Sequence, residues 1–410
     1  MKYFHQVLFL FLVLNLSAQS NPCGNELKYK QTDKEYLIDL DKSMKAFKSW
    51  QLKKKIIADT IFEIPVHVVI HHFPCDSYGE GTNIADEQIL SQIEILNEYF
   101  AHRNADSINI PEQFSTAASR IRFRLASFDP DGNPTDGVTR YGSYESFSQN
   151  DSMIISKTMW SRDKFLNLYF TPYLDIAYGY APIPMPDSLP SIYSDVVTIS
   201  TEVVGERELN PLARQDDTYA EGRIAIHEVG HWLGLRHIWG SSNGCDMDDG
   251  ISDTPLQSRA NRRCPTHPSV SCNNDGDMFM NHMDYTEDLC KTAFSAEQVL
   301  YMEFILEETR SSLINSNSNY MLDTTYPKII LDAKNDLTCQ DSNNGRILLD
   351  GYDGLAPYSF RINQGAFQSS GSFTNLDADL YLVEIKDALG QVSQRPKGFY
   401  LLLHLLRILT

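Results

Sequence analysis

The stretch that decides the fold runs from His227 to His237 and reads His-Glu-Val-Gly-His-Trp-Leu-Gly-Leu-Arg-His. On a helix, His227 and His231 lie one turn apart and point the same way. Two imidazoles placed like this can bind one Zn²⁺ at about 2.0–2.1 Å. Gly234 permits a left-handed residue at the helix end, so the chain can turn and bring His237 back as a third ligand. The stretch therefore predicts a zinc site built on three histidines.

Glu228 follows His227 in the same turn, so its carboxylate can reach a zinc-bound water without binding the metal. Three protein ligands leave the fourth position for that water, and zinc lowers the water's pKa from about 15.7 towards about 7. Glu228 can then take its proton as general base and pass it to a leaving amine. A closed structural zinc site is disfavoured, because such sites are usually rich in Cys and the chain contains no Cys-x-x-Cys.

Length and charge restrict the possible classes of protein. The chain has 410 residues, 42% of them hydrophobic, and a formal charge of −19. This length predicts two to three domains, each able to bury a core. The acidic balance argues against nucleic acid or an anionic membrane as the main partner. Beyond the N-terminus no run of 18 apolar residues occurs, which argues against a membrane span in the mature chain.

The first twenty residues are typical of a secretory signal. Lys2 supplies the positive charge, Val7–Leu16 is apolar except for Asn15, and Ala18-Gln19-Ser20 is a small-residue cleavage site. We therefore expect a secreted, extracellular protein, with the cell surface as an option. Export permits disulfides. Four of the seven cysteines fall between 245 and 290, and four cysteines allow three pairings.

Residues 21–55 are predicted to form a pro-segment. Positions 21–60 hold nine Lys against six Asp or Glu, whereas the rest of the mature chain is strongly acidic. A basic leader on an acidic body suggests a segment held partly by charge and cut at Lys53-Lys54-Lys55. The alternative is an N-terminal helix with a solvated lysine face.

The remaining pattern predicts an α/β domain followed by a small all-β module. Asp86–Ala101 has apolar residues at helical spacing, and Ser295 with Gln298 forms a capping box for a helix reaching about Leu313. Residues 129–150 are expected to be loop, and 314–327 a linker. Residues 328–397 alternate short strands with turns, as in a β-sandwich, and the role of the apolar tail, 398–410, is unknown. Strands are expected at residues 61–70, 121–126, 165–170, 178–183 and 196–200, and a further helix at 221–234.

The eleven-residue zinc stretch resembles the extended motif of the metzincin metallopeptidases. These proteins carry a Met-turn downstream, and Asn281–Tyr285 (Asn-His-Met-Asp-Tyr) is similar to one. The form of this turn, with Tyr two residues after Met, resembles that of the pappalysin (cytophagalysin, ulilysin-like) family. Further local matches run from Ile64–Val68 through Asp253-Thr254-Pro255 to Phe294. The resemblance covers residues 56–313 and implies a catalytic domain with a twisted mixed sheet and an active-site helix.

The resemblance implies a zinc-dependent endopeptidase that hydrolyses protein or peptide substrates. His227, His231 and His237 would bind zinc and Glu228 would be the base. Met283 would form the floor beneath the metal, and Tyr285 would hydrogen-bond the tetrahedral intermediate.

The family also implies a crossed disulfide pattern, Cys245–Cys272 and Cys264–Cys290, which would fix the irregular segment that bears the Met-turn. Calcium is implied too, and the residue-by-residue match leaves Asp249 and Thr254 as its ligands. Cys23 resembles a cysteine switch, in which a pro-segment thiolate takes the open zinc position. A Cys23–Cys75 disulfide and a free thiol are the competing interpretations.

Two features bear on substrates and partners. Glu287 and Asp288 follow the Met-turn and would favour Arg or Lys after the scissile bond if one of them lines the pocket. The module at 328–397 resembles the Ig-like repeat of bacteroidete gliding adhesins, although Gln391 stands where a partner for Cys339 is usual. An inactive surface adhesin is therefore the alternative function. The oligomeric state stays open.

Overall fold

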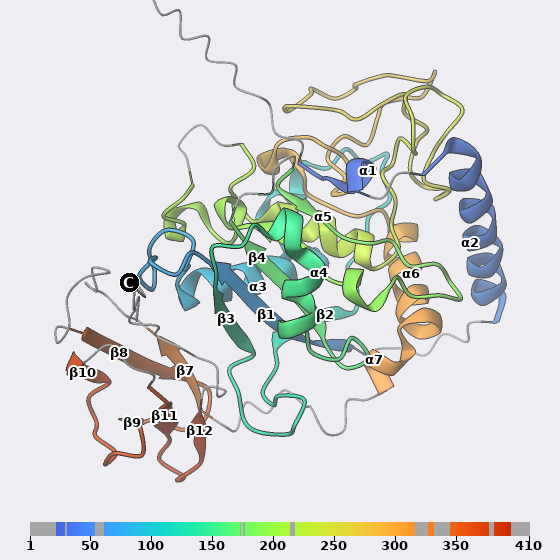
Figure 1. Cartoon of the computed structure of the whole chain (residues 1–410). Coiled ribbons are helices and arrows are strands. Elements are labelled where there is room, and N and C mark those ends of the chain that lie inside the picture. The colour runs from blue at the N-terminus through green and yellow to red at the C-terminus, as the bar shows by residue number, and fades with distance from the viewer. Residues whose placement is uncertain are drawn as a thin grey trace, which may run out of the picture.

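The computed structural model describes most of the chain, and Figure 1 shows its arrangement. The predicted signal, the apolar tail, Cys339 and most of the predicted linker lie outside the described residues. The described ranges are 22–28, 31–53, 61–172, 174, 177–213, 218–315, 327–331, 345–376 and 381–394.

A six-stranded mixed sheet forms the centre of the larger part of the molecule (Figure 1). The main path is β2-β1-β4-β6-β5, and β3 also pairs with β1. All pairs are parallel except β5 with β6. The predicted mixed α/β class is confirmed. The strands are β1 (Phe62–His72), β2 (Ile121–Leu125), β3 (Val138–Gly142), β4 (Leu166–Thr171), β5 (Gly179–Tyr180) and β6 (Val197–Ser200).

The central strands are buried along nearly their whole length. Ten of the eleven residues of β1 and all six of β4 are buried. Parallel strands covered on both faces are typically continuous apolar runs rather than alternating ones. This explains why the β-branched run after Ile61 predicted a strand correctly.

The loop predicted at residues 129–150 was wrong. It contains β3, which pairs with the second half of β1 from Val68 opposite Val138 onward, and the start of helix α4 (Phe147–Thr158). β3 is five residues long, and its partner lies some 70 residues earlier in the sequence. A short strand stabilised by such distant hydrogen bonds leaves little local signal.

Two helices place the motif over the sheet. Helix α3 (Asp86–Phe100) packs on β2 and α5, and α5 (Arg223–Trp232) packs on β6 and β5. The capping box at Ser295 and Gln298 is confirmed and starts α6 (Ala296–Phe304). A π-helical turn, Ile305–Thr309, and α7 (Ser311–Asn315) complete the predicted helix. Within the described residues between α5 and α6, the only assigned element is the 3₁₀ turn Asp288–Cys290.

The N-terminal segment forms α1 (Asn25–Lys28) and α2 (Asp33–Lys53), and α2 packs along α6 (Figure 1). Phe47 and Trp50 are buried, and their rings lie 5.1–5.6 Å from those of Tyr301 and Phe304. The ion pair of Lys42 with Asp187 is exposed on both sides, so salt and solvent screen it. Aromatic burial therefore adds to the charge attraction that the composition predicts, of which the ion pair of Lys28 with Asp151 at 2.7 Å is the better shielded part.

The C-terminal part consists of two three-stranded antiparallel sheets, β10-β8-β7 and β12-β11-β9. Ile329, Ile347, Leu349, Phe360 and Ile385 are buried between them. This agrees with the small β-sandwich that the sequence predicts. In the described part of the chain, no helix is long and apolar enough to span a bilayer. The strands are β7 (Lys328–Leu331), β8 (Gly345–Tyr352), β9 (Ser359–Ile362), β10 (Ser372–Leu376), β11 (Val383–Lys386) and β12 (Val392–Gln394).

Candidate metal and catalytic centre

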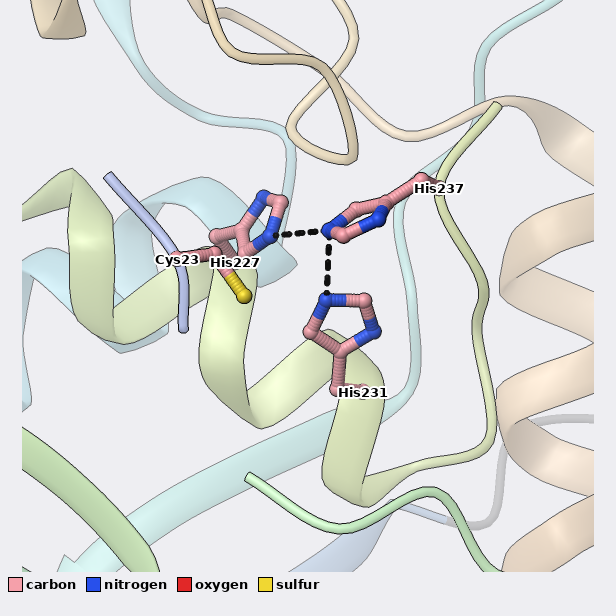
Figure 2. Close-up of side chains that lie close together, drawn as sticks. All are labelled: Cys23, His227, His231 and His237. Atoms are coloured by element: carbon pink, nitrogen blue, oxygen red, sulfur yellow. Dashed lines mark hydrogen bonds between the residues drawn. The ribbon is translucent and has the colours of Figure 1, made fainter. Parts of the chain in front are cut away.

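Three imidazoles converge at the C-terminal end of α5 (Figure 2). The Nε2 atom of His237 lies 3.3 Å from that of His227 and 3.1 Å from that of His231. Ligands bound at 2.0–2.1 Å in tetrahedral geometry are about 3.3 Å apart. The spacing of the three nitrogens therefore fits one zinc ion. All three rings are buried.

The backbone orients two of these rings. Nδ1 of His227 lies 2.7 Å from the carbonyl oxygen of His282, and Nδ1 of His231 lies 2.8 Å from that of Leu235. A carbonyl only accepts, so each Nδ1 donates and each Nε2 keeps its lone pair for a metal. The residue before Met283 thus fixes the first histidine of the motif.

Gly234 makes the turn that returns His237. Its φ is +93°, and a Cβ there would lie 2.7 Å from Ile305. Both the left-handed backbone and the close approach of the π-helical turn require glycine.

Glu228 is fully buried beside the histidines, and its carboxylate lies near the Cys23 thiol and the backbone of Ala181 without a well-formed hydrogen bond to a described residue. Burial raises the pKa of its carboxyl well above the usual value. A buried carboxylate without a well-formed hydrogen bond is costly, and a nearby cation with its water would relieve that cost. This buried group is a second observation that fits a metal.

Met283 packs beneath the helix, and its Sδ would lie 2.7 Å from a Cβ built on Gly230. The sequence motif therefore needs glycine at 230 for contact with the Met-turn. Tyr285 stands beside the metal-binding rings, with its centroid 4.8 Å from that of His237. Both side chains are buried.

Cys23 joins the histidine cluster from the N-terminal segment, as Figure 2 shows. Its Sγ and one nitrogen from each histidine all lie within 4.8 Å of one another. The backbone N–H of Gly24 donates to the carbonyl of Gly179 at 2.8 Å, and that of Ala181 donates to Oδ1 of Asn25 at 3.0 Å. The segment thus lies along the edge strand β5 and holds the thiol at the centre.

Cysteine pairing follows the arrangement that the resemblance implies. Cys245 is bonded to Cys272 and Cys264 to Cys290. Both bridges lie in the long irregular segment between α5 and α6. Cys75 is exposed and unbonded to Cys23, so the competing Cys23–Cys75 disulfide was wrong.

The structure gives no support for calcium. Oγ1 of Thr254 donates to Oδ1 of Asp249 at 2.8 Å, and burial raises the pKa of Asp249 to about 8. The backbone N–H of Ile251 donates to the same oxygen. Among the described residues, the Cys23 and histidine cluster is the only convergence of three or more such ligands. Asp249 is satisfied by its own loop and by the side-chain amide of Gln298 on α6, which lies 3.4 Å from Oδ2.

Glu287 and Asp288 have different surroundings. Glu287 is partly exposed, whereas Asp288 is fully buried with Lys291. Oδ1 of Asp288 lies 3.3 Å from Nζ of Lys291, and Oδ2 accepts the backbone N–H groups of Glu221 and Arg223 at 3.1 and 3.2 Å. Asp288 therefore anchors the start of α5, a role that the sequence reasoning missed.

Comparisons with known proteins agree with this centre. Residues 149–307 match the family model of pregnancy-associated plasma protein-A. An extracellular metalloprotease of Arthroderma gypseum is 31% identical over 233 residues, which are 55% of this chain and 68% of that protein. An extracellular metalloprotease of Trichophyton verrucosum is 28% identical over 54% of this chain and 70% of its own length.

Solved structures extend the similarity to the fold. A promirolysin mutant of Tannerella forsythia has a TM-score of 0.63 and 31% identity, and the match covers 73% of this chain and 99% of that one. Mature mirolysin in complex with a cleaved peptide has a TM-score of 0.57 and 34% identity over 64% of this chain and 99% of its own. Together with the three converging histidines, these similarities show that the chain belongs to the pappalysin family of metzincins and is a zinc metalloendopeptidase.

Proposed function

We propose that the protein is a secreted zinc endopeptidase made as a latent precursor, in which Cys23 blocks the metal. The observation that carries the proposal is the thiol among three imidazoles, beside the buried carboxylate of Glu228. The match with promirolysin covers nine percentage points more of this chain than the match with mature mirolysin. The names of the extracellular relatives and the predicted signal at 1–20 support secretion.

His227, His231 and His237 would hold the zinc, which when bound supplies Lewis acidity and a water of lowered pKa. Glu228 takes a proton from the attacking water and delivers it to the leaving amine. Tyr285 donates a hydrogen bond to the developing oxyanion. The edge of β5, where residues 23–25 now lie, holds the substrate in extended form.

The metal requirement is the direct test of the proposal. Chelation of the processed enzyme with 1,10-phenanthroline should abolish casein hydrolysis, and added Zn²⁺ should restore it, because the metal lowers the pKa of the attacking water. Dialysis without chelator is the control. Hydrolysis that survives a demonstrated loss of zinc contradicts the proposal, and so does metal-loaded, processed enzyme that cleaves nothing.

Latency depends on the thiol. Cys23→Ala in the chain from residue 21 should raise hydrolysis before processing by at least about tenfold, which corresponds to losing 1.4 kcal/mol of binding at the metal. Cys75→Ala removes the exposed cysteine instead and should leave latency unchanged. Equal activity of the Cys23→Ala and Cys75→Ala precursors would rule out the switch.

A preference for Arg or Lys after the scissile bond rests on Glu287, because Asp288 is buried and paired. Cleavage-site profiling should show this preference, and Glu287→Gln should reduce the Arg-to-Gln ratio of kcat/KM by about tenfold, the effect of one charge-assisted contact. Glu297→Gln, on α6, serves as a control. A cleavage profile without a preference for Arg or Lys after the scissile bond contradicts this part of the proposal.

The adhesin alternative is less well supported. It requires a zinc domain without activity, whereas all the motif residues are present and the histidines converge. We propose that the module at 328–397 spaces the enzyme or binds a surface. Calcium has no place in the proposed chemistry.

A further inference from the structure

A cavity of about 780 Å³ opens beside the metal-binding histidines. Its volume lies within the usual range of ligand pockets. His231, Arg236 and His237 line it from the catalytic domain, together with the segment from Pro182 to Pro190. The N-terminal segment closes it with Tyr36 and with the carboxylates of Glu35 and Asp39. The cavity is thus the part of the active-site cleft that the N-terminal segment covers.

Arg236 is the only Lys or Arg among the residues lining this cavity. The side chain is largely buried, and in the described part of the chain its guanidinium forms no hydrogen bond or ion pair. The guanidinium stacks on the ring of Tyr36 with 4.7 Å between Cζ and the ring centroid. A guanidinium carries five N–H donors, and stacking satisfies none of them. No described residue therefore accepts a hydrogen bond from the guanidinium of Arg236, which is turned to the cavity that it lines.

The hydroxyl of Tyr36 donates to the carbonyl of Asp248 at 2.6 Å, and the contact of Arg236 is with the ring of Tyr36 rather than with this oxygen. Tyr36 belongs to α2 and departs with the N-terminal segment when the precursor is processed. That step removes the only described stacking partner of Arg236 and opens the cavity to the cleft. A peptide held along β5 in place of residues 23–25 can then continue into the same space.

We propose that Arg236 is a specificity residue that binds an acidic side chain of the substrate, on the side of the cleft lined by His231 and His237. This inference deepens the proposed peptidase function and rests on it. A carboxylate can accept two parallel N–H bonds from a guanidinium. Arginine forms this bidentate pair, whereas lysine offers a single ammonium group. Glu35 and Asp39 of the N-terminal segment line this cavity in the precursor, so the cavity already accommodates acidic residues.

The test uses processed enzyme and a set of quenched peptides. One neutral parent peptide receives Glu, Gln, Lys or Phe at each of four positions on either side of the cleaved bond. We expect one position at which Glu raises kcat/KM about tenfold over Gln, the scale of a charge-assisted contact. Arg236→Gln should bring this ratio to about one, and Arg236→Glu should reverse it to favour Lys. Arg124→Gln, on β2 and paired with Glu63, should keep the wild-type ratio.

The outcomes separate this inference from the proposed function. Equal cleavage of the Glu and Gln peptides at every position by the wild-type enzyme overturns the role of Arg236 and leaves the peptidase intact. So does a Glu preference that survives in Arg236→Gln, or a preference for aromatic side chains alone. No cleavage of any peptide, including the parent, contradicts both. The decisive arm uses the wild-type enzyme, so it does not depend on whether a variant folds.

Discussion

Glu228→Ala should lower kcat/KM for peptide hydrolysis by about 10²–10⁴, the usual contribution of a positioned general base, while leaving one zinc per chain. The reason is geometric. Glu228 follows His227 on α5, and its buried carboxylate makes no well-formed hydrogen bond to a described residue. It lies beside the metal-binding rings without belonging to the group of converging ligands. Its loss removes a proton carrier and leaves all three imidazoles in place.

Zinc content, measured by atomic absorption, and hydrolysis of a quenched peptide together provide the readout. Glu228→Gln preserves the shape of the side chain and should be nearly as inactive, which separates proton transfer from packing. Tyr285→Phe should raise the activation free energy of hydrolysis by about 2.7–4 kcal/mol, the cost of losing one oxyanion donor. If Glu228→Ala retains activity with full zinc, the general-base assignment is wrong.

The local part of this site could be predicted from the sequence because one helical turn fixes the direction of two side chains. His227 and His231 project from α5 whatever the rest of the chain does, and Gly234 is needed to return His237. The capping box at Ser295 was predictable for the same reason.

Features that depend on distant parts of the chain left a weaker signal. β3 forms through its backbone pairing with β1. The position of Cys23 depends on the N-terminal segment lying along β5, where the N–H of Gly24 donates to Gly179. Composition indicated that residues 21–55 were basic but not that Phe47 and Trp50 would anchor α2 on α6. Aromatic contacts between separate helices have no fixed sequence spacing, whereas charge imbalance is visible in a simple count.

Asp288 illustrates how proximity in sequence misled the prediction. It stands three residues after Tyr285, and its charge suggested a role in binding basic substrate side chains. The structure instead buries it against Lys291, with both side chains fully shielded from solvent. Its second oxygen accepts the backbone N–H of Arg223, the first residue of α5. A carboxylate used in this way stabilises the helix that carries the motif.

Asp288→Ala should therefore destabilise the protein by about 3–5 kcal/mol, because it leaves the Lys291 ammonium buried without its counter-ion. The two N–H groups that now bond to the carboxylate would also lose their acceptor. The free energy of unfolding, from urea titration of the full chain, measures the effect. Asp288→Asn combined with Lys291→Met should cost much less, because no unpaired charge remains and the amide oxygen can still accept from the start of α5. If Asp288→Ala is as stable as the wild type, Asp288 does not anchor the helix, and a pocket role for its carboxylate becomes the better interpretation.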